Sequence, residues 1–495
     1  MEFSLKLIRI SYHKPLSVMK YKLLFCSIFF FAFGTLKAQI PFQNDSMYVR
    51  CTQTLDFAFA QANRLNSKLS GAYLPRTITV NGLSLVTASD WTSGFFPGEL
   101  WYLSNYKNDL TMQNIAKQYT QLLQAQQYTT TTHDLGFMLN CSYGNGLKFA
   151  NVAGYQDVLV QSAKSLQTRI NSTVGCMKSW NNAKWTYPVI IDNMMNLEIM
   201  CLATHLTGDS IYYKAAVNHA LKTITNHYRV DYSSFHLVDY NTTNGTVIGK
   251  QTVQGYSNES SWARGQAWGL YGFTMMYNET KDIRFLNHAK HIADYVIQNL
   301  PADFVFYWDY KDPAIPNAPR DASAASITAS ALLELYRLTN DVLYLTKAEK
   351  IIWNLSSPAY MNVAGENQNF LLKHCTGHKP NNSEIDVPII YADYYFVEAL
   401  YRYVKLKNEI AGIEDIKQES TVFLENGTNR LVINDFKAGI INIELFDISG
   451  KMLNSIIGNK TINQIAEIGG IPHGLYVIKI LDENRKVIHF KVFKN

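Results

Sequence analysis

The sequence predicts a large domain of paired α-helices followed by a small all-β module. Two observations lead to this prediction. A short turn ending in Asp recurs between apolar helical stretches before about residue 408, and apolar and polar residues alternate after about residue 420. At roughly 100–200 residues per domain, the 495 residues have room for two or three such units.

The recurring turn combines Thr, any residue and Asp, and an aromatic residue and an Ala follow it. Clear copies lie at 207–216, 280–289 and 339–348, with a weaker copy at 109–116. In each copy the Asp can cap a new helix, and the aromatic residue and the Ala, four positions apart, share one face of it. Repeated helix pairs build either an open solenoid or a closed toroid. Long loops rich in Trp, His and Asp favour a closed ring with a central pocket.

The end of the chain has a different pattern. Residues 405–420 are polar and charged, so we expect a linker at 409–420 between a helical domain at 39–408 and an all-β domain at 421–495. In the β part, Ile441, Ile443 and Leu445 alternate with other residues, and further strands are expected at 476–481 and 487–493.

The first 38 residues resemble a targeting segment. Lys20 and Lys22 precede an apolar run over 23–33, and the small residue Ala38 marks a cleavage point. Residues 1–18 add nothing that a signal peptide needs, so either Met1 or Met19 can be the start. No later run reaches about 18 apolar residues, so the mature chain is not expected to cross a membrane.

Charge and cysteine content narrow the partners. The net charge of +5 is spread over 45 basic and 40 acidic residues without a basic run, which argues against nucleic acid as a partner. Five of the six cysteines follow the signal segment, and this odd, scattered set is no disulfide framework. No paired-cysteine motif is present, and neither a metal nor a cofactor is expected.

Four segments of the helical part carry residues able to do chemistry, at 90–101, 133–137, 185–197 and 252–269. Asp192 follows an apolar stretch and opens a helix. Burial and a second carboxylate, such as Asp134, would favour the protonated acid that proton donation to a sugar requires. Either residue could instead be a plain helix cap.

Other residues of these segments allow two interpretations. Arg264 and Trp268 are four positions apart and share a helix face, where they could bind a carboxylate and stack on a sugar ring. They could equally be a structural Arg beside a core Trp. His236, considered alone, would most often be a structural histidine.

Taken together, the segments resemble glycoside hydrolase family 88, the unsaturated glucuronyl hydrolases. The likeness runs over about residues 41–403 and is carried by HDLGF at 133–137, DNMMNL at 192–197, QGYSNESSWARGQAWG at 254–269 and PRDASAA at 319–325. It implies an all-α (α/α)6 barrel. It also implies hydration of the C4=C5 double bond that polysaccharide lyases leave on a terminal uronic acid, after which that sugar is released.

The resemblance assigns roles to individual residues. Asp192 would protonate C4 and assist the water that attacks C5, and Asp134 would tune Asp192 and stabilise positive charge on the ring. Arg264 would pair with the uronate, since a guanidinium matches a carboxylate. The remaining expected substrate-binding residues are Trp91, His133, His236, Lys250, Thr252, Gln254 and Trp268. Trp180 and Trp185 are both candidate stacking walls, and residues 374–379 a candidate rim. Val253 stands where some relatives carry His, which leaves substrate preference open.

The C-terminal module is similar to the sorting domain of the type IX secretion system, through residues 445–451, 474–477 and 491–495. This implies that the secretion machinery is a partner and that the protein is secreted or held at the cell surface. The rival interpretation is a small carbohydrate-binding β-sandwich, although the module contains one Tyr and no Trp for stacking.

The predicted function is therefore an unsaturated glucuronyl hydrolase acting on lyase-generated oligosaccharides of the ulvan or glycosaminoglycan type. The basic balance and Lys250 lead us to expect short sulfated substrates. The alternatives are an unsaturated rhamnogalacturonyl hydrolase and a non-catalytic surface glycan-binding protein, although binding alone would need neither Asp134 nor Asp192 as proton donor.

Overall fold

The computed structural model describes residues 45–410 and 421–494, apart from short gaps at 426–427, 435, 437, 448–450, 473 and 485–486. The expected signal peptide at 1–38 lies outside the described residues, and so do positions 411–420 of the expected linker. Positions 409 and 410 of that linker belong to the last helix instead.

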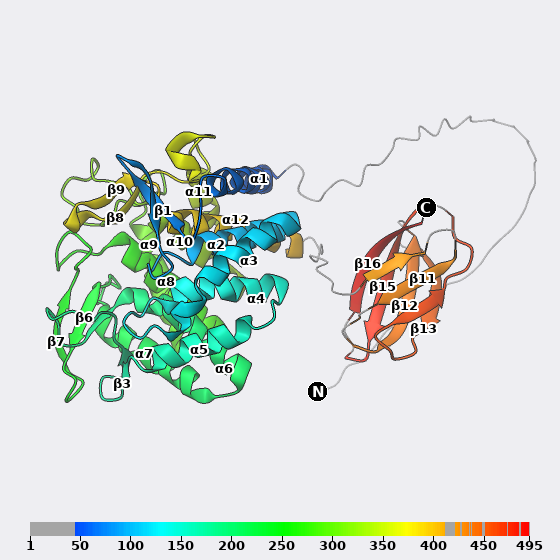
Figure 1. Ribbon diagram of the computed structural model, residues 1–495, viewed down its shortest axis with the longest axis horizontal. Helices are drawn as coiled ribbons and strands as arrows, with labels where there is room; N and C mark the ends of the chain where they lie inside the picture. The colour runs from blue at the N-terminus through cyan, green and yellow to red at the C-terminus, as the bar shows by residue number, and fades with distance from the viewer. Residues whose placement is uncertain are drawn as a thin grey trace, which may run out of the picture. The chain divides into compact units, whose positions relative to one another are not determined.

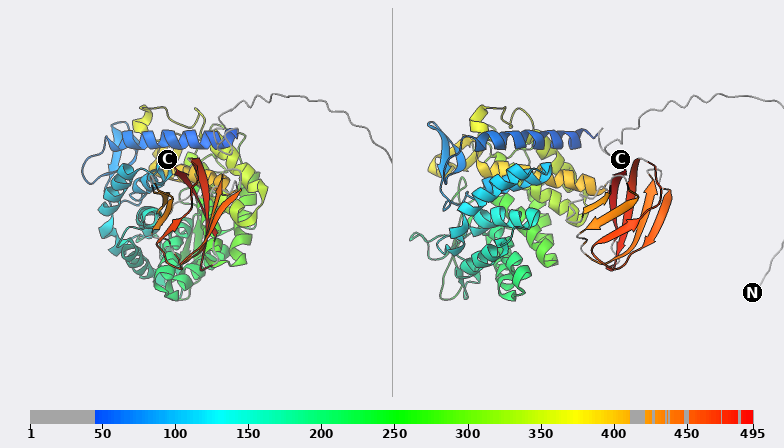
Figure 2. Two further views of the ribbon diagram at one scale, coloured as in Figure 1. Left: turned by 90° about the vertical axis from the view of Figure 1, so that its right-hand side faces the viewer. Right: turned by 45° about the vertical axis from the view of Figure 1, so that its right-hand side comes forward.

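The helical part is a barrel of helix pairs, which Figure 2 shows as a ring. The helices are α1 Ser46–Asn66, α2 Phe95–Lys107, α3 Leu110–Leu122, α4 Asn145–Ala150, α5 Tyr155–Gln167, α6 Leu197–Thr207, α7 Ser210–His227, α8 Ala263–Thr280, α9 Ile283–Gln298, α10 Ala322–Thr339, α11 Val342–Leu355 and α12 Ile390–Ile410. Helices α2, α8 and α10 are buried on all sides over most of their length, whereas α3 and α9 bury one face only. This difference identifies inner and outer helices, and it confirms the expected all-α barrel.

The recurring turns join an inner helix to the outer helix that follows. The carboxylates of Asp109, Asp209, Asp282 and Asp341 accept hydrogen bonds from backbone amides in the first turns of α3, α7, α9 and α11. The aromatic residue and the Ala of the three clear copies are all buried. The capping role expected from the sequence is therefore confirmed at all four positions.

Small antiparallel hairpins and loops gather at one end of the barrel (Figure 1). The strands are β1 Leu74–Thr79, β2 Gly82–Val86, β3 Ile170–Asn171, β4 Cys176–Met177, β5 Pro188–Ile190, β6 Leu237–Tyr240, β7 Val247–Gln251, β8 Cys375–His378 and β9 Ser383–Val387. They pair as β1-β2, β3-β4, β5-β6-β7 and β8-β9. Because Ile190 pairs with Leu237, the chain entering Asp192 runs beside the chain leaving His236.

The C-terminal module is all-β, as expected. Its strands are β10 Thr421–Leu424, β11 Arg430–Asn434, β12 Ile440–Asp447, β13 Met452–Ile457, β14 Gln464–Glu467, β15 Gly474–Asp482 and β16 Val487–Lys494. They form two antiparallel sheets in the orders β10-β11-β14 and β13-β12-β15-β16, around a core of their own. Ile443 and Leu445 are buried, whereas Ile441 is only half-buried because a register shift between Ile440 and Asn442 interrupts the alternation.

No helix in the described part of the chain combines the length and the apolar character needed to cross a bilayer.

Candidate active site

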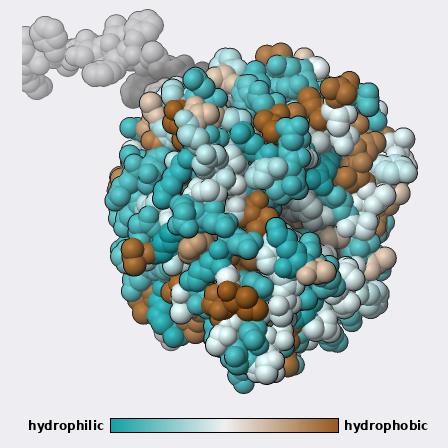
Figure 3. Space-filling model, turned by 90° about the vertical axis from the view of Figure 1, so that its left-hand side faces the viewer, coloured by the Kyte–Doolittle hydropathy of each residue, from teal (hydrophilic) through white to brown (hydrophobic). Residues whose placement is uncertain are grey.

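A cavity of about 220 Å³ opens at the hairpin end of the barrel. Figure 3 shows this face, which is mostly hydrophilic and hollowed near its centre. The cavity is lined by Arg76, Trp91, His133, Asp134, Trp180, Ile190, Asp192, Gln254, Trp262, Arg264, Gly377, His378, Asn381, Ser383, Glu384 and Tyr391. Six of the ten residues selected from the sequence are among them, including both expected catalytic carboxylates.

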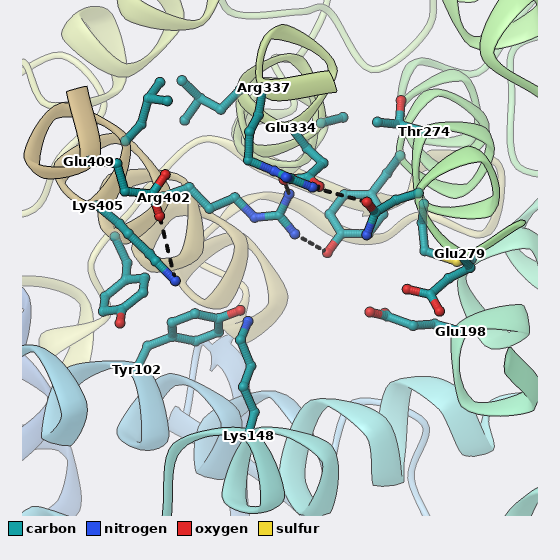
Figure 4. A pocket seen from close by; sticks show the side chains of 17 residues that line it. Tyr102, Lys148, Glu198, Thr274, Glu279, Glu334, Arg337, Arg402, Lys405 and Glu409 are labelled. Atoms are coloured by element: carbon teal, nitrogen blue, oxygen red, sulfur yellow. Dashed lines mark hydrogen bonds and ion pairs between the residues drawn. The ribbon is translucent and has the colours of Figure 1, made fainter. Parts of the chain in front are cut away.

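A second cavity, of about 310 Å³, lies toward the other ends of α8 and α12 (Figure 4). Its two arginines form ion pairs with neighbouring carboxylates. Arg337 pairs with Glu334 at 2.5 Å, and Arg402 pairs with both Glu398 and Glu334. None of the expected site residues lines this cavity, so we assign the smaller hairpin-end cavity as the candidate active site.

Asp192 lies in the short 3-10 helix Ile191–Asn196 that follows β5. Its side chain is buried, and Oδ2 has no hydrogen-bond partner among the described residues. Nε2 of His236 lies 3.6 Å from that oxygen, and the backbone N–H of Ile191 donates to the carbonyl of His236. The carboxylate does not cap the helix. A buried acid that lines a cavity and is not used as a helix cap is a candidate for proton transfer.

Asp134 lies at the start of the turn that leads into the π-helix Gly136–Gly144. Its Oδ2 accepts a hydrogen bond of 2.5 Å from the Thr132 hydroxyl, and its Oδ1 lies 3.3 Å from Nε2 of His133. Among the described residues, this carboxylate accepts no hydrogen bond from a backbone amide of the π-helix. The plain-cap interpretation therefore fits neither Asp134 nor Asp192.

The orientation of His133 follows from its neighbour Asn193. The amide nitrogen of Asn193 donates to the carbonyl of Met177 and to Oγ of Ser179, both at 2.9 Å, so its oxygen is free to accept. That oxygen lies 2.7 Å from Nδ1 of His133. Nδ1 must therefore carry a proton, which leaves Nε2 facing Asp134.

Arg264 differs from expectation in how it is engaged. Nη1 donates to Oδ2 of Asp321 at 2.8 Å and to the carbonyl of Thr376, and Nη2 donates to the carbonyl of Gly377. Both terminal nitrogens thus anchor the loop at 374–379, and only Nε lacks a partner among the described residues. Arg264 lines the cavity, but both terminal nitrogens of its guanidinium already bind protein oxygens, so they do not form a free pair of donors for a uronate.

The tryptophans divide between cavity and core. Trp91 lines the cavity and packs against Phe137 and Tyr391. Trp180 also lines it, whereas Trp185 does not. Trp268 is wholly buried against Phe137 and Tyr395 and is not among the residues that line the cavity, so its expected role as a stacking surface stays a prediction. It lies four residues, about 6 Å, further along α8 than Arg264.

Three further expected contacts are not part of the cavity lining. His236 is buried behind Asp192, between the rings of Trp180 and Trp262. Thr252 closes a turn: its N–H donates to Oδ1 of Asn258 at 3.1 Å. Lys250 lies on β7 with its ammonium 5.5 Å from the ring of Phe235. Lys250 and Thr252 are not among the residues that line the cavity, and their expected substrate contacts stay predictions. Gln254 does line it.

Several lining residues were not predicted from the sequence. Arg76 lies on β1, where Nε and Nη2 bind Glu384 at 2.6 and 3.0 Å and Nη1 binds Asp90 at 2.8 Å. These contacts join segments that are distant in sequence, so no local pattern could reveal them. Trp262 lies inside the QGYSNESSWARGQAWG segment, and Gly377 and His378 lie in the expected rim, so a local signal existed for these three residues.

Among the described residues, no group of three or more His, Cys, Asp and Glu side chains is arranged to hold a metal ion. The five described cysteines are buried and free.

The structure combines a ring of paired helices with a cavity that is lined by aromatic side chains and by two carboxylates that do not cap a helix. This combination is typical of a helical-barrel glycoside hydrolase. No family model matches the chain. An unsaturated glucuronyl hydrolase of Formosa agariphila is 48% identical over 322 residues, which cover 64% of this chain and 80% of that protein. An unsaturated chondroitin disaccharide hydrolase of Streptococcus agalactiae is 30% identical over 351 residues, covering 69% and 88%.

Solved structures agree with these relatives. An unsaturated glucuronyl hydrolase described as specific for heparin matches with a TM-score of 0.71 at 43% identity. The match covers 74% of this chain and 99% of that chain. The enzyme of Bacillus sp. GL1 matches with a TM-score of 0.67 at 26% identity, covering 74% and 100%. The chain belongs to the unsaturated glucuronyl hydrolases, glycoside hydrolase family 88. The predicted family and enzymatic function are confirmed.

Proposed function

We propose that Asp192 is the proton donor of this hydrolase and that Asp134, with His133, is its electrostatic partner. The observation that supports this assignment is the buried carboxyl of Asp192, which lines the same cavity as Asp134 and whose Oδ2 has no hydrogen-bond partner among the described residues. Leaving such an oxygen without a partner is costly in a folded protein, so a functional reason is expected.

The reaction follows from the chemistry of the vinyl ether. Asp192 gives a proton to C4, and the electron pair of the C4=C5 bond forms the new C–H bond. The positive charge left on C5 and the ring oxygen is stabilised by the nearby carboxylate. The Asp192 carboxylate then takes a proton from a water molecule while the oxygen of that water bonds to C5. The resulting hemiketal opens to a ketone, and the hemiacetal left at C1 expels the rest of the oligosaccharide.

The experiment that tests this function follows the ultraviolet absorbance of the conjugated alkene during incubation with lyase-generated oligosaccharides. We expect the absorbance to fall with at least one class of substrate. Intact absorbance with every substrate, on folded protein that binds them, would support the non-catalytic glycan-binding alternative.

For the substrate class, we propose oligosaccharides of the ulvan or glycosaminoglycan type, preferably sulfated. The heparin-specific and chondroitin-acting relatives support this choice. Lys250 no longer supports it, because it does not line the cavity. Turnover of paired sulfated and unsulfated disaccharides tests the preference, and equal or faster turnover of the unsulfated member would contradict it.

For location, we propose export by the signal peptide at 1–38, followed by outer-membrane passage through the type IX secretion machinery that recognises residues 421–495. The support is the seven-stranded module with its own core, together with its sequence likeness to sorting domains. Expression of the full chain and of a chain lacking 421–495 in a host with this machinery tests the proposal. We expect the truncated chain to stay in the periplasm; release of both forms would contradict it.

A further inference from the structure

The loop between β4 and β5 carries two tryptophans, of which only Trp180 lines the cavity. The ring of Trp185 lies beside it, with 5.7 Å between ring centroids and 44° between ring planes. This displacement is roughly the length of one pyranose ring. The two indoles therefore continue one aromatic surface from the cavity toward the outside of the molecule.

Trp185 is held in position by a contact outside its own loop. Its indole N–H donates to Oε1 of Gln251, the last residue of β7, at 3.1 Å. The side chain is only half-buried, and its neighbours 181–184 and Thr186 are exposed. A ring fixed by a hydrogen bond and partly open to solvent is a preorganised stacking surface.

Lys184 adds a positive charge at the same place. Its ammonium lies 4.9 Å from the centre of the Trp185 ring. The side chain is exposed, and within the described part of the chain no ion pair is formed by it. An anionic group on a sugar that stacks on Trp185 would meet this ammonium.

We propose that Trp185 and Lys184 form a subsite for an anionic sugar of the leaving group, one position beyond the sugar next to the cleaved bond. The proposal rests on the proposed function, since it assumes that Asp192 and Trp180 mark the unsaturated end. It predicts that the enzyme favours oligosaccharides longer than a disaccharide, with a sulfate or carboxylate on the sugar that reaches Trp185.

A different role for Trp185 would be to support Trp180 from behind. Chain length separates the two roles, because a disaccharide cannot reach the proposed subsite while every substrate depends on Trp180. The test compares kcat/KM for an unsaturated disaccharide and tetrasaccharide of one polymer, in wild type, Trp185→Ala, Trp185→Phe and Lys184→Ala. Trp353→Ala is the matched control, since Trp353 is 40% exposed on the outer helix α11.

We expect Trp185→Ala to lower the tetrasaccharide-to-disaccharide ratio of kcat/KM at least fivefold and Trp185→Phe to retain most of that ratio. Lys184→Ala should also lower the ratio, and the ratio of this variant should depend less on salt concentration than that of wild type. An unchanged ratio, or equal loss on both substrates, overturns the proposal. Calorimetric binding of both oligosaccharides to Asp192→Asn, with and without Trp185→Ala, measures the subsite without turnover. A length-dependent affinity loss there supports the subsite even if the wild-type protein only binds these oligosaccharides and does not hydrate them.

Discussion

The amide oxygen of Asn193 lies 2.7 Å from Nδ1 of His133 and fixes the proton on that nitrogen. Nε2, 3.3 Å from Asp134, then faces a carboxylate oxygen. The His133 ring is therefore held between the amide of Asn193 and the carboxylate of Asp134. Asn193 thus acts as a positioning residue for the electrostatic partner of Asp192.

Replacing Asn193 tests this relationship. Asn193→Ala frees His133 to adopt the other tautomer. We therefore expect kcat to fall about 10–100-fold, less than the roughly 10²–10⁴-fold that an acid–base group itself contributes, and the pH–rate profile to change shape. Kinetics across pH 5–8 are the measurement. A loss of stability with an unchanged profile would mean that Asn193 is only structural.

The buried pair of Arg264 and Asp321 predicts a large stability effect. Arg264→Met leaves the Asp321 carboxylate buried without its cation, and it also removes donors to two loop carbonyls. We expect a loss of about 3–5 kcal/mol in the free energy of unfolding, measured by denaturant titration. The control is Arg284→Met, which breaks an exposed pair with Asp282 and should change the free energy of unfolding little. Equal losses for the two variants would contradict the anchoring role of Arg264.

The second cavity predicts a pH dependence of stability. Burial, followed by repulsion from Glu279 and Glu398, raises the pKa of Glu198 to about 7; Figure 4 shows the Glu198 and Glu279 side chains turned toward one another. The pKa of Glu198 is higher in the folded than in the unfolded protein. The stability that depends on protonated Glu198 is therefore fully present below about pH 4.5 and is lost as the pH rises through 7.

Glu198→Gln removes this ionisation while keeping an acceptor for the amide of Asn140. We expect the variant to lose about 2–3 kcal/mol less of its free energy of unfolding than wild type between pH 5 and 8, as measured by thermal or urea unfolding at each pH. Parallel stability curves for the two proteins would contradict the raised pKa.

Local sequence signals predicted the parts of the fold that are governed locally. The caps at Asp209, Asp282 and Asp341 follow from hydrogen bonding within a few residues, and the order of the motifs located Asp134 and Asp192. Side-chain direction was less predictable. Trp268 shares a helix face with Arg264, but α8 is buried on all sides, so a shared face does not lead to the cavity.

Contacts that depend on distant segments could not be predicted. Arg76 lies on β1, which contacts β9, more than three hundred positions later in the chain. There the guanidinium of Arg76 donates to the carboxylate of Glu384. The position of the Lys250 side chain could not be predicted for a related reason. It depends on the pairing of β6 with β7, which the spacing from Gln254 does not reveal.

The assignment of Asp192 is tested most directly by the initial rate of absorbance loss from the unsaturated end group. The proteins compared are wild type, Asp192→Asn and the control Asp157→Asn, whose carboxyl is exposed on α5. General acid–base groups contribute about 10²–10⁴-fold, so Asp192→Asn should be slower than wild type by at least about 100-fold while still binding the oligosaccharide, and Asp157→Asn should match wild type. A rate for Asp192→Asn close to that of wild type would contradict its role as proton donor.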